Sequence, residues 1–183
     1  MRTLLCFLVV FVPTCASAQE LPNPKPGKVR EILASNVGTW DCEVKMFLQG
    51  PGEPPLESKG VEVNKLVSSD LYLQTSFTCQ LGDPKFEGHA LTGYDPRSKK
   101  YIGTWVDNLS TIPMQLKGEY DERSITYTVR STVVGETGHE VQQKQITVWT
   151  DSAQKKVETY WIIEQGEKRV DAKVMAMTAT KRD

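Results

Sequence analysis

Residues 91–107 of the chain, LTGYDPRSKKYIGTWVD, contain its clearest structural signal. Asp95 and Pro96 open a turn at the centre, because an aspartate side chain bonds the backbone two residues on and proline presets φ for the second turn position. The residues on both sides suit a pleated strand. On the second strand, the residues that share one alternating face are Tyr101, Gly103, Trp105 and Asp107. The stretch therefore predicts a β-hairpin.

Strand-like segments, separated by turn signals, fill most of the chain around this hairpin. Ten strands are expected, at residues 40–46, 56–66, 71–81, 85–94, 100–107, 113–119, 124–134, 140–150, 155–164 and 168–180. Turn signals at a spacing of about 8–12 residues predict a sandwich or a barrel, and barrel closure removes the exposed sheet edges. No helical stretch interrupts the strands, which excludes parallel βαβ folds. We therefore predict an all-β fold, an antiparallel up-and-down barrel of about ten strands.

The N-terminus has the pattern of a secretory signal peptide. A basic start precedes an apolar run at residues 4–12 and a small-residue cleavage site at residues 16–18. The run is too short to span a bilayer, which takes about 20 residues. We expect a signal peptide at 1–18, cleaved after Ala18, a proline-rich leader at 19–27 and one barrel domain at 28–183. Apolar spacing predicts a short helix over residues 28–37, which we expect to plug one end of the barrel.

Length and charge limit the classes of partner. Cleavage after Ala18 leaves 165 of the 183 residues, which is one domain's worth. Because it removes a single basic residue, the net charge falls from −1 to −2. No basic field exists to attract nucleic acid or an anionic membrane, so we expect neither a nucleic-acid partner nor a stable membrane anchor. The expected location is the periplasm or the extracellular space, and the oligomeric state does not follow from the sequence.

Two cysteines, Cys42 and Cys79, remain in the exported chain. An oxidising compartment favours one disulfide between them. Against this, they lie on the first and third expected strands. With about 4.8 Å between neighbouring strands, the separation comes to about 10 Å, whereas bridged Cα atoms lie within about 7 Å. A disulfide and two buried free thiols both stay open, and the strand spacing favours the thiols.

Four short motifs of this chain carry a resemblance to a known family. They are Gly-x-Trp at residues 38–40, Phe-Glu-Gly at 86–88, Gly-Tyr-Asp-Pro at 93–96 and the segment 101–107. Together they resemble a mainly bacterial family of unknown function that is classed with the calycin-like barrels, relatives of lipocalins and fatty-acid-binding proteins. The resemblance covers about residues 28–182. It implies a barrel with a cavity, and no established activity. In calycins a basic side chain from the last strand often covers the Trp, which here implies Lys181 or Arg182 over Trp40.

An internal cavity is the expected binding site. Ten strands leave more interior space than the eight-stranded barrels that hold one small ligand. The candidates to line this lumen are Trp40, Val44, Met46, Leu73, Phe77, Tyr94, Trp105 and Asp107. Alternatively, the same side chains fill the core and leave no pocket. Asp107 needs a partner or a ligand donor if it points inward, because an unpaired buried carboxylate is costly; with the face reversed it is a surface acid.

The sequence offers little catalytic or cofactor-binding machinery. With His89 and His139 as the two histidines, no spacing supplies the clustered ligands of a zinc site, and we expect no metal. There is no Gly-x-Ser-x-Gly elbow, so a Ser–His pair for nucleophilic hydrolysis would depend on His89 alone. The final strand lacks the histidine through which some ten-stranded calycins hold haem. Haem would depend on His89, for which a surface and a lumenal position both stay open, and we expect no cofactor.

Three functions follow from these observations. The first is a binding barrel that holds a small, largely apolar molecule in its lumen. The second is an interaction or structural protein with a filled barrel, which acts through its surface loops at residues 50–55 and 109–113. The third is an enzyme. It rests on His89 and Asp107, and it fails if their side chains point to opposite faces of the barrel wall.

Overall fold

The computed structural model describes residues 27–47, 53–121, 126–134, 140–165 and 168–183. The expected signal peptide at 1–18, and all of the leader at 19–27 except Gly27, lie outside the described residues. The elements in chain order are α1 (Lys28–Ser35), β1 (Gly38–Met46), β2 (Leu56–Val67), β3 (Tyr72–Cys79), β4 (Phe86–Asp95), β5 (Lys100–Asp107), β6 (Ser110–Asp121), β7 (Thr126–Val134), β8 (Glu140–Trp149), β9 (Gln154–Gln165) and β10 (Lys168–Lys181).

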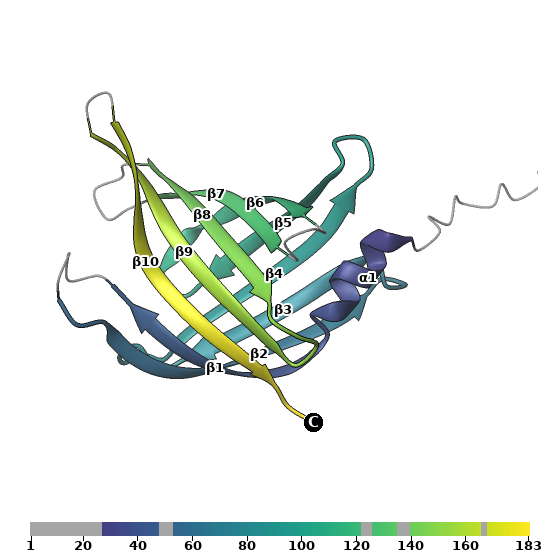
Figure 1. Ribbon diagram of the computed structural model, residues 1–183, viewed down its shortest axis with the longest axis horizontal. Coiled ribbons are helices and arrows are strands. Elements are labelled where there is room, and N and C mark those ends of the chain that lie inside the picture. The colour runs from purple at the N-terminus through teal and green to yellow at the C-terminus, as the bar shows by residue number, and fades with distance from the viewer. Residues whose placement is uncertain (1–26, 48–52, 122–125, 135–139, 166–167) are drawn as a thin grey trace, which may run out of the picture.

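The ten strands form a closed antiparallel barrel (Figure 1), which confirms the predicted fold class. Each strand pairs with its neighbours in sequence. β1 then pairs with β10 to close the ring, with Trp40 opposite Lys181 and Met46 opposite Met175. Closure gives every strand a neighbouring strand on both sides, and the shortest ladder joins Lys117–Asp121 of β6 to Thr126–Arg130 of β7.

The predicted hairpin at 91–107 forms between β4 and β5, whose ladder ends with Asp95 opposite Lys100. Asp95 accepts hydrogen bonds from the Arg97 backbone N–H at 3.0 Å and from the Ser98 hydroxyl at 2.9 Å. These bonds hold the pKa of Asp95 below its usual range, because they stabilise the carboxylate. The turn chemistry expected from the sequence is therefore the chemistry that closes this hairpin.

β6 is longer than the predicted strand at 113–119, because Pro113 lies inside it rather than at its start. The ladder between β5 and β6 is irregular between Trp105 and Asp107. A proline lacks the N–H that a regular ladder uses, and it is tolerated where a bulge interrupts the hydrogen bonds. Pro113 lies in this irregular part of the β5–β6 ladder and outside the β6–β7 ladder, which begins at Lys117, so it breaks no regular pair that either ladder contains.

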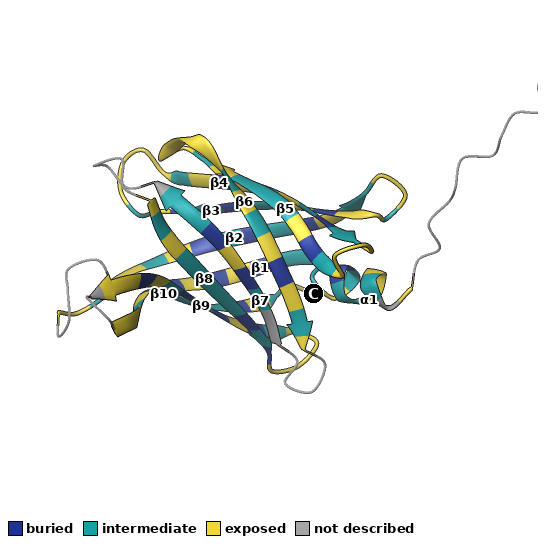
Figure 2. Cartoon of the chain, turned by 90° about the horizontal axis from the view of Figure 1, so that it is seen from above, coloured by how far each residue is buried: buried dark blue, intermediate teal, exposed yellow. Residues whose placement is uncertain are grey.

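Exposed and buried residues alternate along many of the strands (Figure 2), so each strand has one face toward the interior. At one end of the barrel that interior is covered by α1. Leu33 is buried there and packs against Leu73 and Tyr101. The helix therefore plugs one end, as predicted. It ends at Ser35, slightly earlier than expected, with Asn36 as its C-cap.

Trp40 is fully buried close to this plugged end. Its Nε1 donates a hydrogen bond to the Asn36 carbonyl oxygen at 2.8 Å. Two ammonium groups lie over its ring, Lys155 Nζ at 4.5 Å and Lys181 Nζ at 5.5 Å from the ring centre. The basic lid that the resemblance implies is therefore Lys181, joined by a second lysine, whereas Arg182 forms an ion pair with Asp41.

The glycine of the Gly-x-Trp motif has a steric reason. Gly38 has a φ of +131°, a region that side chains rarely adopt. A Cβ at this position would lie 2.7 Å from Cε of Lys181. Glycine thus lets the aliphatic stem of Lys181 cross the backbone closely and place its ammonium group over Trp40.

Cys42 and Cys79 are both free and buried, and both are cross-strand neighbours of Gly60 on β2. Burial raises the pKa of Cys42 to about 12, and the nearby Glu62 carboxylate adds to this effect. Burial also raises the pKa of Cys79. Because the thiolate is the reactive form of cysteine, both side chains are chemically quiet in the folded protein.

We expect neither thiol to react with iodoacetamide in the folded protein at about pH 8, because the reagent needs a thiolate that it can reach. In denaturant, both should be alkylated without prior reduction. Peptide mapping by mass spectrometry measures each site separately. Labelling of either cysteine in the folded protein, or a need for reductant in the unfolded one, would contradict this arrangement.

Candidate functional site: the barrel lumen

The interior of the barrel holds a cavity of about 350 Å³. Its lining includes side chains from all ten strands and from α1, so it is the lumen of the barrel rather than a surface groove. The volume lies within the range of about 300–1,000 Å³ that is typical of small-molecule sites. The lumen is therefore not completely filled by its own side chains.

Five of the eight predicted lumen residues line this cavity: Met46, Leu73, Phe77, Trp105 and Asp107. The other three are inside the barrel but do not reach the open space. Trp40 and Val44 lie in the buried cluster behind Val157 and Met177, which do line the cavity. Tyr94 packs edge-on against Tyr101, with 5.2 Å between ring centres, in the cluster beneath α1. The prediction that these three residues line the lumen is therefore wrong: their side chains fill the core and do not line the cavity.

His89 lies outside the barrel wall. Its side chain is 46% exposed, with Nε2 2.9 Å from the Glu87 carboxylate and Nδ1 3.1 Å from the Ser76 hydroxyl. Asp107 lines the cavity inside. The lumenal position considered for His89 is wrong, and the two side chains on which an enzyme would depend face opposite sides of the wall. Within the part of the chain that the structure describes, no three His, Cys, Asp or Glu side chains gather as a metal site would need.

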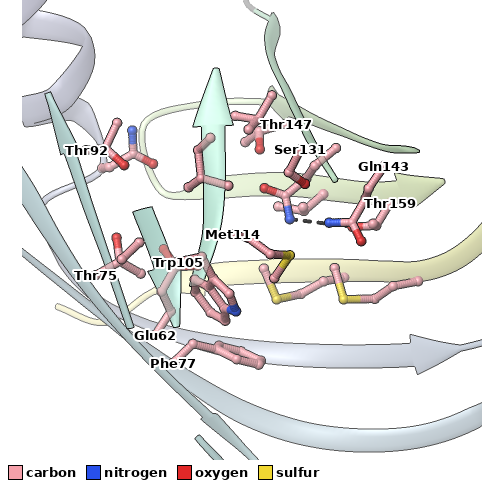
Figure 3. A pocket seen from close by; sticks show the side chains of 18 of the residues that line it. Glu62, Thr75, Phe77, Thr92, Trp105, Met114, Ser131, Gln143, Thr147 and Thr159 are labelled. Carbon is pink, nitrogen blue, oxygen red and sulfur yellow. Dashed lines mark hydrogen bonds between the residues drawn. The ribbon is translucent and has the colours of Figure 1, made fainter. Parts of the chain in front are cut away.

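A row of three aromatic rings forms one side of the cavity. Phe77 and Phe86 have ring centres 6.0 Å apart, and Phe86 stacks on Trp105 at 6.5 Å with 19° between the ring planes. The Trp105 indole is also held by a hydrogen bond, because its Nε1 donates to Oδ2 of Asp107 at 2.8 Å. Figure 3 shows Trp105 and Phe77 on the same side of the pocket. The indole is thus fixed in place and presents a ring to the lumen.

Asp107 has the partner that an inward carboxylate requires. Besides accepting from Trp105, it accepts the backbone N–H groups of Leu109 and Ser110 at Oδ1, at 2.9 and 3.2 Å. One carboxylate therefore ties the tryptophan to the turn between β5 and β6. Both of its oxygens accept hydrogen bonds from the protein itself, and one of these bonds orients the Trp105 ring.

Gly88 makes room for the Trp105 indole, which lies against its backbone. A Cβ at Gly88 would fall 2.1 Å from Cζ2 of Trp105, so any side chain there must displace the ring. We expect Gly88→Ala to lower the free energy of unfolding by about 1–3 kcal/mol, which is the usual cost of overpacking a core. Chemical denaturation measures it. Gly82→Ala is not a usable control because its φ is positive, whereas Thr104→Ala on the neighbouring strand should change little.

The methionines gather at this cavity. Of the five in the sequence, all but Met1 line it: Met46, Met114, Met175 and Met177. Met46 and Met175 are cross-strand neighbours, and Met114 is the cross-strand neighbour of Trp105. Methionine is unbranched and polarisable, and it adapts its shape to irregular partners. A wall of this kind can close around an apolar molecule more easily than branched side chains can.

A buried ion pair lies at the plugged end of the lumen. Lys155 Nζ is 2.6 Å from Oε1 of Glu62, and the two side chains are 3% and 11% exposed. The Lys155 ammonium also donates to Oδ1 of Asn36 at 3.1 Å. Asn64 donates to the same Glu62 oxygen and accepts from the Thr75 hydroxyl at 2.6 Å. The network satisfies both charges inside the protein, as buried ions require.

Uncharged polar side chains form another part of the lining, on three adjacent strands, which we call the polar wall. They are Ser131 on β7, Gln143, Gln145 and Thr147 on β8, and Thr159 on β9. Figure 3 shows Ser131, Gln143, Thr147 and Thr159 together, across the pocket from Phe77 and Trp105. Neither this wall nor the ion pair is among the features predicted from the sequence. The alternation along β9 was the available signal for Lys155 and Thr159, because both lie on the same face of the strand as the apolar Val157, and all three line the cavity.

These features define the class of protein: a closed, ten-stranded antiparallel barrel whose candidate site is an internal cavity. The chain belongs to a family of unknown function, DUF1579, whose model matches residues 25–181. This agrees with the resemblance to a family without an established activity. Whether the Gly-x-Trp and Gly-Tyr-Asp-Pro motifs mark that family stays a prediction.

Two solved structures have a similar fold. One is the S-type phycobiliprotein lyase CPES from Guillardia theta, at 12% identity and a TM-score of 0.57, with 85% of this chain and 93% of that chain covered. The other is Rv2717c from M. tuberculosis, at 11% identity and a TM-score of 0.62, with 87% and 100% covered. No curated protein matches the chain. At such low identity the likeness establishes the fold alone.

Within the described residues, no helix has the length and apolar character that a membrane span needs.

Proposed function

We propose that this protein is an exported binding protein that holds a small, largely apolar molecule in its lumen. The observation that carries the proposal is the open cavity of about 350 Å³ beside a fixed tryptophan. A barrel without a ligand-binding role has no need of such a space, because protein interiors are normally close-packed. The N-terminal signal pattern supports export.

The other functions considered fit the lumen less well. An interaction protein that acts through its loops predicts a filled barrel, whereas this one is open. A hydrolase or a haem site that relied on His89 would have to use a side chain on the outer face. Within the described residues the lumen contains no histidine.

The test compares two phenylalanine substitutions at neighbouring positions of β4. Ala90 lines the cavity and is the cross-strand neighbour of Trp105, so Ala90→Phe should fill the lumen. Leu91 is 46% exposed on the outside, so Leu91→Phe is the matched control. The probe is phenylnaphthylamine, a neutral dye whose fluorescence rises in apolar surroundings. Native mass spectrometry of protein purified without denaturant serves as the second measurement.

We expect the wild type and Leu91→Phe to bind the dye one-to-one and Ala90→Phe to lose binding at least tenfold while keeping its β-sheet circular dichroism. Any small molecule retained through purification should be absent from Ala90→Phe alone. The proposal fails if the wild type binds no dye and carries no adduct, or if filling the lumen leaves dye binding unchanged.

A further inference from the structure

Two hydroxyl groups of the polar wall have no hydrogen-bond partner among the described residues. Ser131 and Thr147 are each 7% exposed and line the cavity. Within the described residues, the one fully enclosed side-chain polar atom without a partner is Nε1 of Trp149. The Ser131 and Thr147 hydroxyls are therefore not sealed in the wall, and they face the open space of the lumen. Polar groups this deeply buried require a hydrogen-bond partner.

Two glutamines extend this set of groups. Ser131 is the cross-strand neighbour of Gln143, and Gln145 is the cross-strand neighbour of Thr159. Gln145 makes a long contact of 3.5 Å to the Thr159 hydroxyl, and the Gln143 amide has no partner among the described side chains. Each amide carries both donors and an acceptor. The wall thus offers donors and acceptors at neighbouring points along one side of the cavity.

The charged side chains of the lining argue against an anionic ligand. Among the described residues that line the cavity, the charged ones are Glu62, Asp107 and Lys155. Lys155 is the single cation, and it is already bonded to Glu62 and Asn36 and lies over the Trp40 ring. An anionic ligand would therefore meet no free positive charge in the lumen. It would also meet the Asp107 carboxylate beside Trp105.

From these three observations we infer the chemical class of the ligand: a flat, uncharged molecule with an apolar body and carbonyl or hydroxyl groups along one edge. The body lies against the aromatic row of Phe77, Phe86 and Trp105. The polar edge bonds Ser131, Gln143 and Thr147. This inference rests on the proposed function, because it names the ligand class of the same lumen. It excludes free fatty acids and other carboxylates.

Three probes that share one three-ring skeleton test the inference. Anthracene has no heteroatom, anthraquinone adds two uncharged carbonyl groups, and an anthraquinone monosulfonate adds a negative charge. Each competes with phenylnaphthylamine for the wild-type protein, and the displacement constants are compared. We expect anthraquinone to bind about fivefold to tenfold more tightly than anthracene, which corresponds to one or two net hydrogen bonds. The sulfonate should bind most weakly.

The variants locate the polar contact. Thr147→Val removes a lumenal hydroxyl at almost unchanged volume, and Gln143→Leu removes a lumenal amide. Each should reduce the preference for anthraquinone over anthracene by about threefold or more. Gln142→Leu is the matched control, because Gln142 is the neighbouring residue, is exposed and bonds Thr132 on the outside. If Gln143→Leu does not fold, Thr147→Val still tests the polar contact, because it keeps the shape of the side chain.

The outcomes separate the two proposals. If neither the dye nor any three-ring probe binds, the proposed function itself fails. If anthracene binds as tightly as anthraquinone, or the sulfonate binds best, or Thr147→Val leaves the preference unchanged, the lumen still binds ligands but the inferred class is wrong.

Discussion

Replacing Lys155 by methionine is expected to lower the free energy of unfolding by about 3–5 kcal/mol, the usual cost of removing one member of a buried ion pair. The substitution leaves the Glu62 carboxylate in the lumen without its cation and frees the Asn36 side-chain oxygen. It also removes one of the two ammonium groups over Trp40. The remaining carboxylate then has Asn64 as its partner. Urea denaturation followed by circular dichroism measures the loss.

The double variant Glu62→Leu with Lys155→Met distinguishes an unpaired charge from lost packing. Apolar replacement of a whole buried pair is often neutral, so most of the lost stability should return. Lys45→Met is the surface control, because the Lys45–Glu57 pair is more than half exposed and solvent screens it. If the double variant is as unstable as Lys155→Met alone, the pair is not the reason for the loss.

Truncating Trp40 to alanine is expected to cost about 3–5 kcal/mol, the range for large aromatic residues in a closed core. Trp40 has no solvent exposure, and its removal leaves a cavity, an unmatched Asn36 carbonyl oxygen and two lysines without the ring beneath them. Differential scanning calorimetry should show a large decrease in Tm. The loss should exceed that of any other single tryptophan substitution.

Trp161 provides the comparison for this prediction. It lines the cavity but is 37% exposed, so Trp161→Ala removes less buried area and should cost clearly less stability. Trp161→Ala should instead weaken binding of phenylnaphthylamine, which Trp40→Phe should leave nearly unchanged. Equal losses of stability for Trp40→Ala and Trp161→Ala would show that the plugged end is not the core that we describe.

The sequence was sufficient to predict the barrel because its signals are local. The Asp95 turn and the apolar spacing of α1 each depend on residues close together in the chain, and the structure confirms both. The family resemblance added Lys181 as the lid on Trp40. The predicted start of β6 was wrong, because the pairing of β6 with its two neighbours, which is irregular beside β5 and absent beside β7 before Lys117, leaves room for Pro113 within the strand.

The site could be predicted only in part, because inward residues of distant strands decide which side chains reach the open space. On β4 the usual pattern is reversed: Leu91 is exposed, whereas Gly88 and Ala90 face inward and leave room for Trp105. No local pattern in the sequence shows this. Glu62 and Lys155 lie 93 positions apart, and their pairing depends on barrel closure. Trp40 lies inside the barrel as predicted, but the Lys155 ammonium lies over its ring, and Lys155 rather than Trp40 lines the cavity.

The most direct test of a ligand-binding lumen is the methyl spectrum of protein labelled with carbon-13 at the methionine methyl groups. Four methionines line the cavity, and the fifth, Met1, lies outside the described residues. We expect phenylnaphthylamine to shift the resonances of Met46, Met114, Met175 and Met177 together, in proportion to the dye bound, and Ala90→Phe to abolish the shifts. Saturation of the protein with dye while these four resonances stay unmoved would contradict binding in the lumen.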